Sequence, residues 1–100
     1  MTVKLETFDA AKYFTDPIDQ ADLLDDAVGT GHAGYIANAL GVIARAQGMA
    51  KLAEATGMQR TALYRALSEN GNPTLETVLK VVDALGLEIH IQPKRELAAV

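Results

Sequence analysis

The sequence contains no cysteine and no tryptophan, and aromatic residues make up only 5% of its 100 residues. Without cysteine the chain forms no disulfide and offers no thiolate to a metal ion. No apolar run approaches the roughly 20 residues that a membrane-spanning helix needs. The first ten residues, MTVKLETFDA, lack the continuous apolar segment of a signal peptide. We therefore expect a cytoplasmic protein with no membrane anchor.

The chain also lacks a net positive charge, since its formal charge is −4. This balance by itself argues against a nucleic-acid partner. The charge is uneven, however: residues 1–31 carry two lysines against seven acidic residues, and residues 32–100 carry seven basic against six acidic residues. Such asymmetry suggests two different partner surfaces. The alternative is that the acidic residues form an ordinary solvated helix face.

Residues 49–67, MAKLAEATGMQRTALYRAL, are typical of two short helices joined by a tight turn. Ala53 is small enough to let the helices approach each other, and Gly57 accepts the positive φ of a sharp turn. Leu63 is expected to point from the second helix into the core, beside Leu52 and Met58. This is the pattern of a DNA-binding helix-turn-helix, although any helical hairpin with a glycine cap has similar spacing.

The remaining pattern is also helical. Asp9 suits the cap of a short helix ending near Thr15. Further helices are predicted over Pro17–Val28, His32–Gln47 and Leu75–Leu85, the last capped by Thr74. Two apolar faces are expected: Ile18, Ala21, Leu24 and Val28 on the first of these helices, and Leu75, Val78, Leu79, Val82 and Leu85 on the last.

Residues Leu87–Gln92 then switch to a period of two, which predicts a β-strand closed by Pro93. A single strand leaves its backbone groups unpaired. Its candidate partners are the weakly alternating segment Val3–Glu6 or the same strand of a second copy. We divide the chain into an acidic N-terminal arm with helices (1–31), a helix-turn-helix domain with the terminal strand (32–92) and a tail (93–100).

In a helix-turn-helix the second helix enters the major groove, where arginine reads guanine, glutamine reads adenine and threonine contacts thymine. The expected groove-facing residues are Gln59, Arg60, Thr61, Tyr64 and Arg65. Lys51 is placed for a phosphate, and Asn72 for another near a helix start. The alternatives are that Tyr64 packs against the first motif helix, that Lys51 is an ordinary surface lysine and that Asn72 belongs to a turn.

We find no catalytic constellation and expect no enzymatic activity, cofactor or metal. His32 and His90 have no acidic or cysteine neighbour at metal-ligand spacing. We interpret His32 as a residue of a helix cap and His90 as a solvent-facing residue. Gly29-Thr30-Gly31 lacks the preceding strand of a dinucleotide-binding fingerprint.

Residues Phe8–Ile91 resemble the probable addiction-module antidote proteins. The resemblance is carried by GMAKLAEATGM, LYRALSENGNPTLET and ALG before the alternating segment, with Asp9 and Tyr13 earlier. It implies a mainly α fold: a lambda-repressor-like helix-turn-helix bundle of about five to six helices with one C-terminal β-strand. Gln47 departs from the family, which more often has a basic residue there, and this removes a possible phosphate contact.

The resemblance further implies a HigA-like, Xre-class antitoxin of a type II toxin–antitoxin system. Such a protein binds and neutralises a small basic RelE/HigB-type ribonuclease toxin and represses its own operon as it binds operator DNA. We hypothesise that acidic residues face the toxin and that the protein is a homodimer. The acidic set is Asp16, Asp19, Asp22, Asp25 and Asp26. The alternatives are a free-standing Xre-type repressor without a toxin and a helical protein-binding module that has lost DNA binding.

Overall fold

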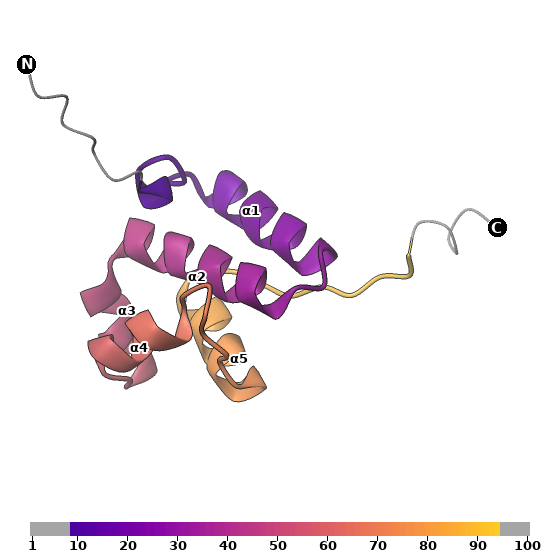
Figure 1. Cartoon of the computed structure of the whole chain (residues 1–100). Helices are drawn as coiled ribbons and strands as arrows, with labels where there is room; N and C mark the ends of the chain where they lie inside the picture. Colours follow the sequence, from indigo (N-terminus) through magenta and orange to yellow (C-terminus); the bar gives the residue numbers. More distant parts are fainter. Residues whose placement is uncertain (1–8, 95–100) are drawn as a thin grey trace, which may run out of the picture.

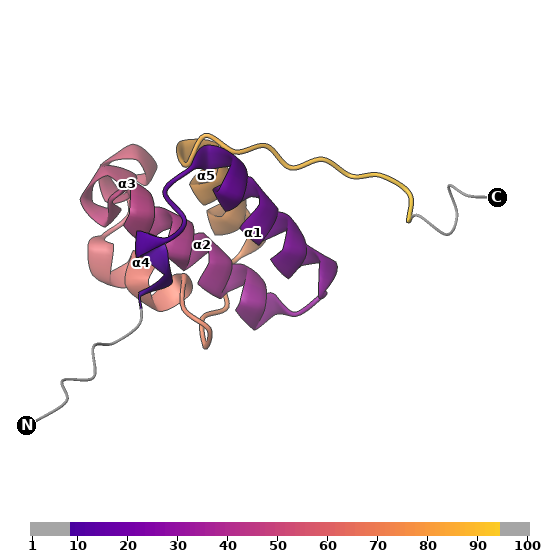
Figure 2. The ribbon, with the colours of Figure 1, turned by 90° about the horizontal axis from the view of Figure 1, so that it is seen from above.

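The computed structural model describes residues 9–94, and over that range the fold is mainly helical. A 3-10 turn and five α-helices follow in order: η1 (Ala10–Lys12), α1 (Pro17–Gly29), α2 (Ala33–Gln47), α3 (Met49–Thr56), α4 (Arg60–Ala66) and α5 (Leu75–Ala84). Helix α2 lies at the centre, with α1 along one side and α3, α4 and α5 on the other (Figure 1). Seen from above, α1 is nearest the viewer and α5 lies beyond α2 (Figure 2).

Side-chain caps begin several helices where the sequence predicts them. The Asp16 carboxylate accepts a hydrogen bond from the Ile18 N–H at 2.7 Å, with Pro17 in the first turn of α1. Thr74 Oγ1 accepts one from the Thr77 N–H at 3.1 Å. His32 is the N-cap of α2, as predicted. The short helix expected after Asp9 is only the single 3-10 turn η1.

Asp9 fastens η1 to the central helix. Its Oδ1 accepts a hydrogen bond from the Ala11 N–H at 3.0 Å and lies 3.4 Å from Arg45 Nη2 of α2. The backbone N–H of Ala11, aided by the Arg45 guanidinium, lowers the pKa of the Asp9 carboxyl below its usual value. Because both contacts favour the charged form, acid weakens this attachment as the pH falls below the ordinary aspartate range.

The core forms where α2, α3, α4 and α5 meet. Leu40 and Ile43 of α2, Leu63 of α4 and Val81 of α5 are fully buried, and Leu52 of α3 packs with them. Because each of these helices supplies only one or two large side chains, the core is complete only when all four assemble. The second helix of the predicted motif is therefore fixed in place by the rest of the chain.

Two glycines let the chain after α4 run directly against α2. A Cβ at Gly41 would collide with the carbonyl oxygen of Leu67, and one at Gly34 would lie 2.6 Å from that of Glu69. Gly41 therefore marks a close approach within the fold. Its neighbour, however, is the end of α4 rather than the side of another helix.

The apolar face predicted for α5 is wrong at two positions. Val81, Val82 and Leu85 are buried, but Leu75 is 72% exposed and Leu79 is 51% exposed. The spacing of these leucines is helical, yet α5 packs on the core along only one edge of its apolar stripe.

The face predicted for α1 is shifted in the same way. Ile18 and Val28 are exposed, whereas Ala27 and the polar Gln20 are buried. The helix therefore packs on α2 through a face that includes an amide. Periodicity by itself did not identify this face.

The predicted strand Leu87–Gln92 is absent from the part of the chain that the structure describes. After α5 the chain turns at Gly86, whose φ is +77°, and residues 87–94 have no regular secondary structure. A strand requires a neighbouring strand for its backbone hydrogen bonds, and residues 9–94 provide none. The possible partner Val3–Glu6 lies outside the described residues.

Candidate nucleic-acid interface

Helices α3 and α4 are joined by the tight turn that the sequence predicts. Gly57 adopts the left-handed conformation at φ +73° and donates its N–H to the carbonyl of Ala53 at 2.9 Å. Thr56 strengthens the turn, because its hydroxyl donates to the carbonyl of Leu52 and accepts from the N–H of Met58. Leu63 then anchors α4 in the core. The opposite face of α4 is thereby fixed toward solvent.

That outer face carries the predicted groove-facing set. All of its members are exposed: Gln59, Arg60, Thr61, Tyr64 and Arg65. Tyr64 is 47% exposed, so it is not enclosed against α3. Residues 55–68 include two arginines and no acidic residue. Positive charge on the exposed face of a helix is the arrangement that contacts phosphates and base edges.

Three cationic side chains near this face have no bonding partner within the described residues. Within residues 9–94 the ion pairs join Arg45 to Asp9, Lys80 to Glu76 and His90 to Glu88. Over the same residues, Lys51, Arg60 and Arg65 make no side-chain hydrogen bond or ion pair. A ligand that binds them therefore displaces no internal salt bridge.

The structure does not gather every predicted contact on α4. Lys51 is exposed on α3 and borders a shallow hollow between α3 and the end of α5, beside Gly86. Asn72 is also exposed, but it borders an apolar groove lined by Leu24, Val28 and Leu75 of α1 and α5. The nearby Thr74 hydroxyl already caps α5.

The acidic set lies on α1, across α2 from α4 (Figure 1). Asp16 accepts the capping hydrogen bond of α1. The other four are exposed: Asp19, Asp22, Asp25 and Asp26. None of these four forms an ion pair within the described residues. The fold therefore places unpaired negative charge on one side and unpaired positive charge on another.

Gln20 and Gln47 have structural roles that the sequence did not reveal. Gln20 is only 2% exposed and donates its amide to the carbonyl of Phe14 at 2.8 Å. The Gln47 amide donates to Gln20 Oε1 and to the carbonyl of Leu85, both at 2.9 Å. Gln47 thus links α1, α2 and the end of α5. In both bonds Gln47 is the donor, through Nε2, so its side chain is engaged inside the fold.

Residues 9–94 were also compared with what a metal centre and a membrane span require. They contain no group of three or more histidine or acidic side chains arranged to hold a metal ion. None of their helices is long and apolar enough to cross a lipid bilayer.

A family model described as probable addiction module antidote protein matches residues 4–93. The chain belongs to this antidote family. The antidote chain is also 40% identical to an uncharacterized protein of Haemophilus influenzae over 95 residues, which is 95% of this chain and 98% of that relative. No solved structure matches this chain. An antidote of an addiction module implies a toxin as partner, so the resemblance noted in the sequence is confirmed at this level.

Proposed function

We propose that this antidote protein is a lambda-repressor-like antitoxin of the HigA-like Xre class. It binds and neutralises a RelE/HigB-type ribonuclease toxin and represses its own operon as a homodimer. The carrying observation is the outer face of α4, where Arg60 and Arg65 are exposed and unpaired on a helix anchored by Leu63. Family membership supplies the toxin partner. The protein acts as a non-enzymatic regulator in the cytoplasm.

The proposed DNA contacts divide into base reading and backbone positioning. Arg60 and Arg65, with Gln59, Thr61 and Tyr64, face the major groove from α4. Lys51 contacts a phosphate from α3. Two copies would place two α4 helices in successive major grooves, about 34–36 Å apart. Asn72 is the weakest member of the set, because the structure places it beside an apolar groove.

Arg60→Ala is expected to weaken operator binding by about 1–3 kcal/mol and to relax the preference at one base pair. Lys51→Ala is expected to weaken binding equally on all sequences and to reduce the salt slope by about one unit. Fluorescence anisotropy with operator and scrambled DNA at several salt concentrations measures both effects. Both side chains are exposed and unpaired within the described residues, so neither substitution should alter stability appreciably. Identical behaviour of the two variants on every sequence would show the assignment of roles to be wrong.

The acidic face of α1 is the proposed toxin contact. A ribonuclease that binds RNA presents a basic surface, and opposite potentials accelerate association. Asp19, Asp22 and Asp26 recur at helical spacing and are exposed without an ion pair in the described chain. Asp16 belongs to the same set, but its carboxylate is engaged by the N-cap.

Replacing Asp19, Asp22 and Asp26 by asparagine is expected to slow association with the toxin about tenfold at low salt, with a smaller effect at high salt. Surface plasmon resonance with the toxin encoded beside this protein measures the rate. The matched control removes three acidic charges elsewhere, through Glu54→Gln, Glu69→Gln and Asp83→Asn. If the control slows association equally, net charge rather than α1 is responsible. Point variants are preferable to deleting residues 1–31, because deletion would uncover the side of α2 that α1 covers.

The net charge of −4 favours a second candidate function, a helical protein-binding module that has lost DNA binding. This candidate predicts toxin binding with no preference for DNA upstream of the protein's own gene. A gel shift at two salt concentrations separates the two functions. A gene for the toxin beside this one would in turn exclude a free-standing repressor.

A further inference from the structure

The segment that follows α5 has backbone N–H and carbonyl groups that make no hydrogen bond within the described chain. Leu87 still donates its N–H to the carbonyl of Val82 at 3.0 Å. From Glu88 to Gln92, the backbone has no hydrogen bond to any other part of the described chain. Leu87, Ile89 and Ile91 nevertheless alternate with polar residues, as in a strand that is apolar on one face. This is the pattern of a strand whose partner is not within residues 9–94.

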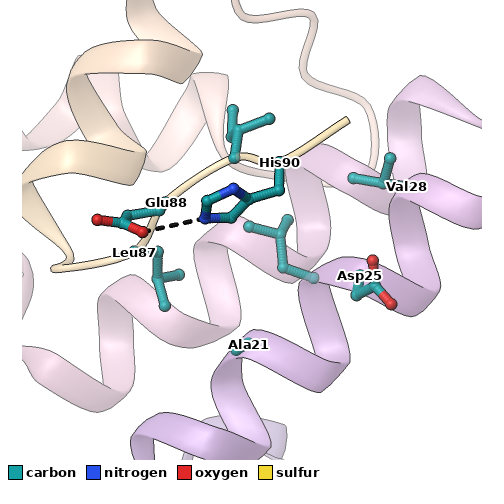
Figure 3. A pocket seen from close by; sticks show the side chains of 8 residues that line it. Ala21, Asp25, Val28, Leu87, Glu88 and His90 are labelled. Atoms are coloured by element: carbon teal, nitrogen blue, oxygen red, sulfur yellow. Dashed lines mark hydrogen bonds and ion pairs between the residues drawn. The ribbon is translucent and has the colours of Figure 1, made fainter. Parts of the chain in front are cut away.

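The apolar face of this segment is covered only at its beginning. Leu87 packs against the core, Ile89 is 51% exposed and Ile91 is 95% exposed. The segment runs past α1, and together they line a hollow that includes Ala21 and Val28 (Figure 3). A second hollow, lined by side chains of α5, lies along the same segment. An added strand would therefore find partly apolar surface beside this segment, with Val28 of α1 on one side and Leu79 of α5 on the other.

We propose that Leu87–Ile91 pairs antiparallel with the same segment of a second copy about a twofold axis through Ile89. The proposal rests on the homodimer of the proposed function and assigns its contact surface. A twofold interface uses the same patch on both copies, so the segment must be complementary to itself. In this register Leu87 lies opposite Ile91 of the other copy, and Glu88 lies opposite His90.

The charges and the proline favour this register over its neighbours. Residues that lie opposite each other in antiparallel strands share a face. Only an axis that passes through a residue sets apolar residues opposite apolar ones and polar residues opposite polar ones. An axis through Glu88 would oppose two carboxylates, which is destabilising. An axis through His90 would oppose Leu87 to Pro93, which has no N–H to donate. With the axis at Ile89, each strand instead offers Glu88 to a histidine of the other.

The exposure of Ile91 is then explained. In the pair it lies beside the other copy's Leu87, next to the hollows that flank that residue. His90 Nε2 and Glu88 Oε2 lie 3.0 Å apart on the polar face of one chain (Figure 3). Pairing would extend this contact into a cluster of two carboxylates and two imidazoles. Helix α4 and the acidic residues Asp19, Asp22 and Asp26 border neither hollow and stay free for their ligands, whereas Asp25 lines the hollow beside the segment.

The absence of cysteine from the chain makes disulfide trapping a clean test. Ile89→Cys places two thiols directly opposite, where Cα atoms of paired strands are about 4.5–5.5 Å apart, within disulfide range. Mild oxidation of the full-length variant should give a covalent dimer in high yield. Ile91→Cys alone is the matched control, because its two copies are offset by four residues, about 13 Å. Mixing Leu87→Cys and Ile91→Cys chains should restore cross-linking.

A charge swap tests the register independently. Glu88→Lys should raise the dimer dissociation constant about tenfold in sedimentation equilibrium, because the variant loses both carboxylate–imidazole contacts between the two strands. Adding His90→Glu to that variant should restore dimerisation. Both side chains are exposed, so the fold itself should be unaffected.

Equal cross-linking of Ile89→Cys and Ile91→Cys would overturn the register. A dimer in which Ile89→Cys does not cross-link would place the interface elsewhere. A monomeric protein would overturn the proposal. The segment would then be available to pair with Val3–Glu6 or with the toxin. Gel shifts and toxin binding by the unmodified protein are read separately. A cross-linked Ile89→Cys dimer from a chain that binds no DNA would therefore contradict the proposed function and not this interface.

Discussion

Leu63→Ala is expected to lower the free energy of unfolding by about 2–5 kcal/mol. Leu63 is fully buried and is the large side chain by which α4 is held between α2, α3 and α5. Its removal leaves a cavity under α4 that no nearby exposed side chain can fill without uncovering another part of the core. For a domain of this size the loss corresponds to a fall in Tm of about 10 °C or more. Thermal denaturation followed by circular dichroism measures it.

Leu75→Ala is the matched control for this prediction. The same atoms are removed from a leucine that is 72% exposed at the start of α5. Its effect should stay within about 0.5 kcal/mol. If both substitutions cost the same, α4 is not anchored by Leu63, and the orientation of its outer face would be in doubt.

Gly41→Ala is expected to destabilise the fold by about 3 kcal/mol, although alanine is the better helix former. The added methyl group would collide with the carbonyl oxygen of Leu67, a backbone atom at the end of α4. Because this neighbour cannot rotate away, α4 and the chain after it must shift away from α2. Urea denaturation of the purified variant gives the free-energy change.

Gly29→Ala provides the comparison within another helix. Gly29 is the last residue of α1, and a Cβ there would meet nothing within 4 Å. This substitution should be neutral or stabilising by up to about 1 kcal/mol. Equal stabilisation by both alanines would mean that the segment after α4 does not press on α2.

Local signals in the sequence predicted the helices well. Asp16 before Pro17, Thr74 before a helical stripe and Gly57 in the left-handed conformation each act through neighbours within four residues. Caps and turns of this kind are decided by local backbone geometry. The helical hairpin that carries the candidate interface was therefore predictable before its surroundings were known.

Burial was less predictable, because it depends on what packs against each helix. Leu75 and Leu79 match the helical period but lie outside the edge of α5 that meets the core. Gln20 is buried because two carbonyl or amide partners satisfy its side chain, and one of them comes from 27 residues later in the chain. A periodicity argument contains no information on such distant partners.

The segment Leu87–Gln92 shows the same limit for strands. Its alternation is genuine, but a strand exists only with a neighbour, and residues 9–94 provide none. The candidate site was predictable as a set of exposed residues on α4. The assembled helices were needed to show that this site is separate from the acidic face of α1. They were also needed to show that Lys51 and Asn72 lie away from α4.

The central claim is that one small domain binds DNA through α4 and a toxin through α1. The most direct test is the affinity of the full-length protein for DNA upstream of its own gene, measured with and without saturating toxin. We predict that this DNA binds more tightly than unrelated DNA of equal length, and that binding persists when toxin is bound, because the two faces lie on opposite sides of α2. Equal affinity for both DNAs, or displacement of DNA by the toxin, would contradict the account.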